Sequence, residues 1–397
     1  MALRLDIPES QSREQRLGSI TGYHGTFKNL INQGCSGCLT NKKRCFSTAS
    51  SCSHTHAVNQ LAAIKDVVVV DHAPAGCSSG MINFSINRNR VNFNKSGEKK
   101  HLVVVSSNMK ESDTIFGGIK KLKNAIREAY RRHKPKAIYV STSCTSSIED
   151  YERASKSIAS FGQCGAQSSY LAGALEQLFG IKYFQSHLPF GGIGFERFYM
   201  DIAKFVKKED IAKEVIRQYR EKYENELNYI KNKLKGKTAF VALGASYAFE
   251  YTRILRELGV KVLHTVAYHY DPKLDNQSDD LVAAAKDAEE FDYDMEISVN
   301  DAQQFETYLL VKNNEPDFIV SRAHGASVWG VKMGIPAIEA KISLEVFGYD
   351  GLVAFGRTVV NELENNNFVK KLGRRYVSPF TNKFESSKPQ SYLMEVK

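Results

Sequence analysis

Seven cysteines are the residues of this sequence best suited to chemistry, and all of them lie within the first 164 of its 397 residues. An odd number of cysteines confined to one part of a long chain is a poor disulfide framework, so the clustering favours a metal centre. For any one cysteine, a buried thiol is the plainer interpretation. Cys52, Cys77 and Cys144 are too widely spaced for a compact zinc ribbon, whose ligands come in close pairs. Their soft thiolates suit iron–sulfur clusters or zinc, and three ligands suggest a site completed by another chain or another ligand.

Two of these cysteines end short polar turns. Cys77 closes the turn that begins at His72 and passes through Gly76, and Cys144 closes the run Ser141-Thr-Ser-Cys144. A histidine beside a glycine turn can donate an N–H bond toward cluster sulfur and so tune a redox potential. The alternative is that His72 only shapes the loop.

A second group of cysteines precedes the first. Cys35 and Cys38 form a CxxC pair, and Cys45 follows in the same glycine-bearing segment. Such a pair can bind metal or perform redox chemistry. These three residues could hold an additional cluster, extend the first site, or compete with Cys52 as a ligand.

The elements that must position Cys77 and Cys144 are short apolar strands. Residues 66–70, 101–105 and 137–140 are predicted strands, and 120–133 has the apolar spacing of a helix. Strands that alternate with amphipathic helices predict a parallel sheet covered on both faces. Because Cys77 and Cys144 each follow a strand of this sheet, we expect their side chains to converge in one crevice.

The same alternation of strands and helices begins again at Gly236, with predicted strands at 238–243, 260–263, 317–320 and 336–338. We therefore predict an α/β protein of repeated Rossmann-like, doubly wound parallel-sheet units with a helical connector. The predicted divisions are a cysteine-bearing N-terminal arm at 1–60, a first unit with the cluster ligands at 61–165, a helical connecting segment at 166–235, and a second unit with the C-terminal tail at 236–397. We read the arm as irregular, and expect the ligand cavity between the units.

Composition narrows the class of protein. The net charge is +10, but the basic residues come in short dispersed groups beside helical patterns, so nucleic-acid binding is not predicted. No apolar run approaches the roughly 20 residues of a membrane span, and the N-terminus lacks a long apolar signal region, so we expect a cytoplasmic protein. A P-loop motif and a GxGxxG fingerprint are both absent from the sequence, and no catalytic residue can be named from a motif.

Together, Cys52, the run His72-Ala-Pro-Ala-Gly-Cys77 and the run Ser141-Thr-Ser-Cys144 resemble the cluster-binding pattern of the nitrogenase component 1 superfamily, which includes protochlorophyllide reductase and nickel-sirohydrochlorin diamide reductase. The likeness runs from about residue 34 to 360. It implies that Cys52, Cys77 and Cys144 supply half of an iron–sulfur cluster site shared with a homologous component 1 chain or a second copy of this chain. It also implies a separate ATP-hydrolysing iron-protein reductase that delivers single electrons.

The resemblance extends to Cys164, which is similar to the cysteine that anchors a second metallocofactor in nitrogenase. A plain buried thiol is the alternative for Cys164. Only 20 residues separate it from Cys144, and residues 337–343 contain no histidine where the family's cofactor ligand would fall. His324 could substitute as a ligand, or it could be a loop histidine bonded to a nearby carbonyl.

These observations predict an iron–sulfur oxidoreductase subunit that receives electrons from an ATP-dependent reductase and reduces a bound substrate other than dinitrogen. The first alternative is a scaffold on which a metallocofactor is assembled, because the family contains such scaffolds with nearly the same motif. The second alternative is a binding module without redox activity, in which the cysteines are structural.

Overall fold

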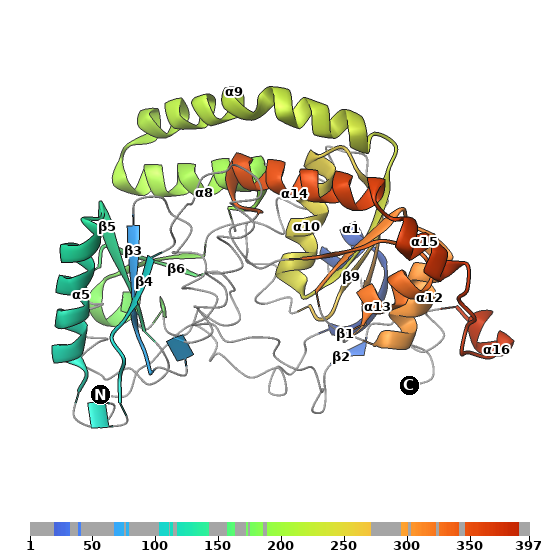
Figure 1. Cartoon of the computed structure of the whole chain (residues 1–397), viewed down its shortest axis with the longest axis horizontal. Coiled ribbons are helices and arrows are strands. Elements are labelled where there is room, and N and C mark those ends of the chain that lie inside the picture. Colours follow the sequence, from blue (N-terminus) through green and yellow to red (C-terminus); the bar gives the residue numbers. More distant parts are fainter. Residues whose placement is uncertain are drawn as a thin grey trace.

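The computed structural model describes the following parts of the chain: residues 20–31, 39–40, 67–74, 77–78, 103–110, 112–113, 117–142, 157–162, 172–173, 175–185, 189–270, 295–300, 303–322, 325–340 and 346–388. Within them, helices and mostly parallel strands form two larger sheets joined by long helices, and a third sheet of two strands (Figure 1). The predicted α/β class is confirmed.

The first sheet holds three parallel strands: β3 (Val67–His72), β4 (Val103–Ser106) and β5 (Ala137–Thr142). Their order is β4-β3-β5, so the strand that comes first in the chain lies in the middle. Helix α5 (Ile119–His133) packs on one face, where Leu122, Ala125 and Ala129 contact Val68 and Val70. The predicted strands and helix of this unit are therefore confirmed to within a few residues.

The second sheet has seven strands in the order β12-β11-β8-β9-β10-β1-β2. Its parallel part comprises β8 (Thr238–Leu243), β9 (Lys261–Ala267), β10 (Glu296–Val299), β11 (Phe318–Ser321) and β12 (Ala337–Glu339). The chain begins at the central strand β8, moves outward through β9 and β10, returns to β11 on the other side of β8, and moves outward to β12. This is a doubly wound order, with its switch point between β8 and β11.

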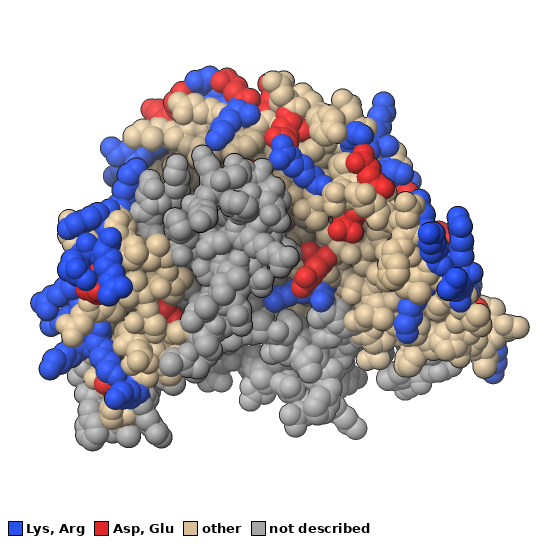
Figure 2. Space-filling view, viewed as in Figure 1, with Lys and Arg blue, Asp and Glu red and all other residues tan. Residues whose placement is uncertain are grey.

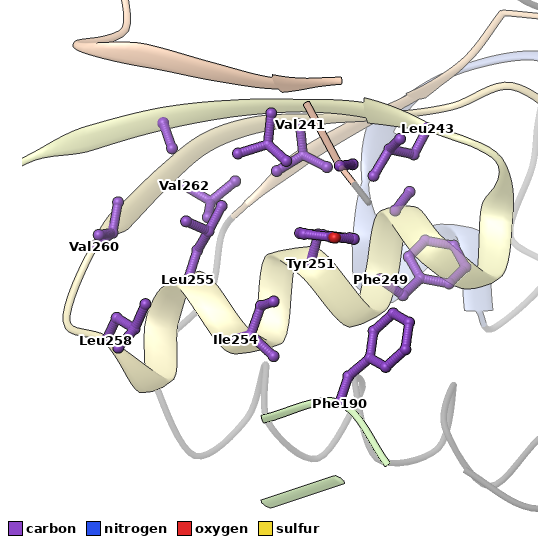
Figure 3. Packing of buried hydrophobic residues seen from close by; sticks show 14 of the residues in the cluster. Phe190, Val241, Leu243, Phe249, Tyr251, Ile254, Leu255, Leu258, Val260 and Val262 are labelled. Atoms are coloured by element: carbon purple, nitrogen blue, oxygen red, sulfur yellow. The ribbon is translucent and has the colours of Figure 1, made fainter. Parts of the chain in front are cut away.

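Both faces of the second sheet are buried, which explains why β8 is apolar at nearly every position. Val241 and Leu243 face a core that includes helix α10 (Ala245–Glu257), where Tyr251 and Leu255 are fully buried (Figure 3). Phe240 points to the opposite face. That face packs against α12 (Gln304–Asn314) and α13 (Ala326–Lys332).

Long helices lie across the two sheets (Figure 1). Helix α8 (Gly191–Val206), α9 (Glu209–Leu234) and α14 (Gly348–Glu364) contact one another, and α8 also contacts α10. Glu257 of α10 accepts the backbone N–H groups of Gly192 and Ile193 at 2.9 and 3.2 Å, so a carboxylate of the second unit caps the start of α8. No helix in the described ranges is long and apolar enough to cross a membrane.

The remaining elements are peripheral. Strands β6 (Ala159–Gly162) and β7 (Lys182–Gln185) form a separate parallel pair. Helices α15 (Asn367–Gly373) and α16 (Asn382–Glu385) follow α14. Glu385 accepts hydrogen bonds from Tyr308 and Lys312 of α12, which fixes this part of the chain to the second unit.

The prediction of an irregular N-terminal arm is wrong for the part that the structure describes. Strand β1 (Ile20–Thr26), helix α1 (Phe27–Ile31) and strand β2 (Leu39–Thr40) are regular elements. β1 pairs antiparallel with β10, far away in the sequence. Phe27 and Leu30 are buried in the core of the second unit. Burial of these side chains favours the folding of the arm against the second unit, which the arm's own composition does not indicate.

A pair of histidines fastens β1 to the sheet. His24 Nδ1 and His264 Nε2 lie 2.8 and 2.9 Å from the same Ser298 hydroxyl, and the two rings stack with centroids 5.6 Å apart. Burial lowers the pKa of both histidines, and each further lies near Glu296, which acts in the opposite direction. Both rings are therefore held neutral in the folded protein.

This arrangement predicts an acid-sensitive fold. The unfolded chain binds protons at these histidines near their ordinary pKa, whereas the folded chain does so only at lower pH, so the free energy of unfolding decreases as the pH falls below about 6.5. Urea titrations of the wild type at pH 7.5 and 5.5 would measure this loss. His264→Gln should lose less stability between the two pH values than the wild type, whereas His133→Gln, at an exposed helix end, should match the wild type. Equal losses in all three proteins would contradict the prediction.

Candidate metal centre

The carboxyl ends of β3 and β5 lie side by side. The two strands pair in parallel over their whole length, with Asp71 opposite Ser141 and His72 opposite Thr142. Cys77 follows five residues after His72, and Cys144 follows two residues after Thr142 in the sequence. The structure thus brings together the two strand ends that carry these cysteines, as the sequence predicted.

The turn that carries Cys77 is held by its backbone. The N–H groups of Cys77 and Ser78 both donate to the carbonyl of Pro74, at 3.0 and 3.1 Å. Met109 N–H donates to the carbonyl of Ala73, which ties the start of the turn to the segment after β4. The Cys77 side chain is half-buried, so its sulfur is not enclosed by the chain and remains able to bind a ligand.

Polar side chains fill the space beneath this turn. Asp71 is fully buried and accepts a hydrogen bond from the Ser78 hydroxyl at 2.7 Å. The Ser78 hydroxyl also lies 2.9 Å from that of Ser106 on β4. Buried polar groups that are bonded in this way rigidify a site.

His72 is fully buried at the last position of β3. Its Nδ1 lies 2.8 Å from the Ser107 hydroxyl. Its ring also packs so closely on Gly118, the residue before α5, that a Cβ there would come within 2.7 Å of ring atoms. These contacts fix the position of the His72 ring, and both its predicted roles, a bond toward cluster sulfur and the shaping of the loop, stay predictions.

Cys77 and His72 are the two predicted site residues that the structure describes. The others lie outside the described residues: Cys35, Cys38, Cys45, Cys52, Gly76, Cys144, Cys164 and His324. Among the residues that are described, no three histidine, cysteine or carboxylate side chains gather as metal ligands. The ligand assignments therefore stay predictions.

The second sheet has its own carboxyl edge at the switch point between β8 and β11. Tyr268, which follows β9, donates its hydroxyl to the carbonyl of Ala242 at 2.8 Å and lies 3.5 Å from the Ser321 hydroxyl. Burial raises the pKa of Tyr268 to about 12, so the phenol stays neutral at physiological pH. Arg322 follows β11 at this edge, directly before the run that contains His324.

Sequence patterns missed three polar residues near this edge. Asn300 follows β10, Glu306 lies in the first turn of α12, and Arg322 follows β11. Within the part of the chain that the structure describes, each has one buried atom without a hydrogen-bond partner: Asn300 Oδ1, Glu306 Oε1 and Arg322 Nη1. Burial raises the pKa of Glu306 to about 8. Unpaired buried polar atoms are costly and mark candidate ligand contacts.

The first unit also presents a basic surface. Helix α5 carries six lysines and arginines and one glutamate, a net charge of +5 (6 − 1) with His133 neutral. The side chains of Lys120, Lys123, Arg127 and Arg132 are exposed, and blue atoms gather over this helix at the left of Figure 2. We call the exposed lysines and arginines of α5 the basic face.

Comparisons with known proteins show what this chain is similar to. A profile of the nitrogenase component 1 type oxidoreductase family matches residues 52–149 and 145–364. The nitrogenase molybdenum-iron protein alpha chain of Methanosarcina barkeri is 22% identical over 325 residues, covering 56% of this chain and 60% of that protein. The nitrogenase iron-molybdenum cofactor biosynthesis protein NifE of Nostoc sp. is 29% identical over 138 residues, covering 31% of this chain and 27% of that protein. A solved structure of nitrogenase Cp1 at pH 5 aligns with a TM-score of 0.48 and 18% identity, over 84% of this chain and 91% of that chain.

The fold and the turn after β3 define a cysteine-bearing α/β protein with two largely parallel sheets. Because the family match covers well over half of its residues, the chain belongs to the nitrogenase component 1 type oxidoreductase family. It spans less than two thirds of the length of the two relatives above.

Cys77, the one predicted cluster ligand among the described residues, fits the iron–sulfur cluster that this family implies. Cys77 is a soft donor held on a fixed turn, half-buried, at a strand end adjacent to the one that precedes Cys144. Thiolates at buried, converging strand ends are the ligands that iron–sulfur clusters require.

Proposed function

We propose that the chain is the component 1 subunit of an oxidoreductase, which takes electrons from a separate ATP-hydrolysing reductase and reduces a bound substrate other than dinitrogen. The observation that carries this proposal is the parallel register of β3 and β5, which brings the carboxyl ends of both strands to one edge. Family membership supplies the chemistry to be expected at that edge.

In this proposal Cys52, Cys77 and Cys144 hold an iron–sulfur cluster together with a homologous chain or a second copy of this chain. The bound cluster would supply one-electron transfer. The Pro74 carbonyl fixes the Cys77 turn, and the fully buried His72 keeps water from that side of the strand end.

The substrate would lie at the carboxyl edge of the second sheet, because doubly wound sheets bind ligands at their switch point. Arg322 and Asn300 would hold polar groups of a substrate, since each has a buried atom without a hydrogen-bond partner, and Glu306 would hold a proton there, since its pKa of about 8 keeps it protonated at neutral pH. Cys164 and His324 would hold a second metallocofactor near this edge, which stays a proposal because both lie outside the described residues.

The reductase would be a separate protein, since this sequence contains no P-loop with which to bind ATP. The basic face of α5 supports the proposal that this reductase has an acidic docking surface, because complementary charges steer association and fix orientation. Gly118, the residue before α5, lies against the His72 ring, so the first turn of α5 lies beside the proposed centre.

A metallocofactor assembly scaffold is the second candidate. The similarity to the cofactor biosynthesis protein NifE favours it, and so does the lack of a histidine between residues 337 and 343. A scaffold would bind iron and release it to another protein without steady turnover.

Anaerobic purification followed by iron and sulfide analysis, and by EPR spectra before and after reduction, tests the proposal. We expect bound iron and sulfide and a signal that a nitrogenase-type iron protein reduces only with ATP. Iron that moves to an acceptor protein without such reduction would favour the scaffold. A folded protein without iron, alone and with a homologous chain, would refute both.

A further inference from the structure

Asp71 is a buried acidic residue directly behind the Cys77 turn, and the ligand assignment gives it no function. It is fully buried near the end of β3, one position before His72. Aspartate is seldom fully buried, because transferring a carboxylate from water costs several kcal/mol unless hydrogen bonds compensate. Its presence here indicates a use that an apolar or neutral residue would not serve.

The hydrogen bonds that connect Asp71 to Ser78, Ser106 and Asn108 have one direction. Ser78 donates its only hydroxyl proton to Asp71 Oδ2 at 2.7 Å. The Ser106 hydroxyl, 2.9 Å from Ser78 Oγ, must therefore be the donor in that contact. The Asn108 N–H donates in turn to Ser106 Oγ at 3.1 Å. Three donors in sequence thus point their positive ends toward one carboxylate.

This chain of bonds reaches the residue next to Cys77. Ser78 shares the Pro74 carbonyl with Cys77, and consecutive Cα atoms are about 3.8 Å apart, so the Asp71 carboxylate lies on the order of 10 Å or less from the Cys77 sulfur. A charge at that distance in a buried site acts on its neighbours with little screening.

We propose that Asp71 is a positioning residue of the metal centre, which locks the Cys77 turn through Ser78 and places a negative charge that lowers the centre's reduction potential. This inference rests on the proposed function. A fixed negative charge opposes the arrival of an electron, and net charge and hydrogen bonding are levers that set cluster potentials. The Ser78 hydroxyl offsets part of that charge by donating to it.

Two substitutions at the same contact should shift the potential in opposite directions. Asp71→Asn keeps an acceptor for Ser78 and removes the charge, so the midpoint potential should become more positive. Ser78→Ala keeps the charge and removes the hydroxyl that offsets it, so the midpoint should become more negative. Damage to the turn alone would not give opposite signs.

The experiment is an EPR-monitored redox titration of the iron-loaded wild type, Asp71→Asn, Ser78→Ala and the control Asp113→Asn. Asp113 is paired with Lys121 in the same unit, and its loss should leave the midpoint unchanged. Shifts of the same sign in Asp71→Asn and Ser78→Ala, or no shift in either, would overturn the proposal. If Asp71→Asn does not fold, a Ser78→Ala midpoint equal to or above that of the wild type overturns it.

A second readout does not depend on the metal. Iodoacetamide alkylates the thiolate form of a cysteine, so the rate at which it modifies Cys77 in metal-free protein reports how strongly the turn stabilises the Cys77 thiolate. Peptide mass spectrometry measures that rate. Asp71→Asn should be alkylated several-fold faster than the wild type and Ser78→Ala more slowly, whereas equal rates in all three would overturn the proposal. If the wild type proves to bind no iron, the proposed function fails and the claim about the reduction potential fails with it, whereas the alkylation rates still show whether Asp71 and Ser78 control the Cys77 turn.

Discussion

Cys77→Ala is expected to abolish the reducible iron signal while leaving the fold intact. The residue lies on a fixed turn where two parallel strand ends meet, and its side chain is half-buried, so removing the sulfur costs little packing. A cluster that loses a thiolate ligand should bind more than about 100-fold more weakly, since loss of mere outer-shell contacts already costs 10- to 100-fold. Iron and sulfide analysis with EPR after anaerobic purification measures the result, and circular dichroism checks the fold.

Cys164→Ala is the matched control, because Cys164 is assigned to a second metallocofactor instead. It should keep the signal that Cys77→Ala loses. If Cys164→Ala lost the same signal, or Cys77→Ala kept it, the assignment of Cys77 to the shared cluster would be wrong.

The first unit could be predicted from the sequence because its signals are local. Residues 67–70 are four consecutive valines, of which Val68, Val69 and Val70 are buried in a parallel sheet, and α5 shows its buried face at Leu122, Ala125 and Ala129. The carboxyl-end rule then places the turns after β3 and β5 together without any knowledge of side-chain contacts. The network of Asp71, Ser78 and Ser106 could not be predicted in this way, since it joins residues on different strands.

Strand β1 could not be predicted from the sequence, because the strand with which it pairs lies far away in the chain. Tyr23 pairs with Val299 and His24 with Ser298, so nothing near residue 24 indicates a strand. With β10 and α12 also absent from the predicted elements, Asn300 and Glu306 had no expected strand end to follow. Polar residues near a sheet edge become candidates only once that edge is known.

Glu306→Gln is expected to raise the free energy of unfolding at pH 7 by about 3 kcal/mol. Only 5% of Glu306 is exposed, and five consecutive residues after it in α12 are buried as well, so water does not solvate the carboxylate. Its place in the first turn of the helix favours a negative charge, but burial outweighs this and raises the pKa to about 8.

The direction in which pH changes the free energy of unfolding follows from the number of protons that the folded and the unfolded chain bind. Between the ordinary pKa of glutamate, about 4.5, and the folded value, about 8, the folded chain keeps the proton and the unfolded chain releases it. Stability is therefore lost as the pH rises through this range, by about 1.4 kcal/mol per pH unit. Glutamine has nearly the same shape as the protonated acid and does not titrate, so the substitution removes this loss.

Urea titrations of the wild type and Glu306→Gln at pH 4 and pH 7 test the argument. The advantage of glutamine should be large at pH 7 and close to zero at pH 4, where glutamate is protonated in both states. Glu362→Gln, at an exposed position of α14, should stay within about 0.5 kcal/mol of the wild type at pH 7. An advantage of Glu306→Gln that is equal at both pH values would mean that the carboxyl group is not the cause. Glu306 destabilises the fold by this much and has an unpaired carboxyl oxygen near the edge of the sheet. It is therefore the residue that we would next test for a direct part in substrate binding.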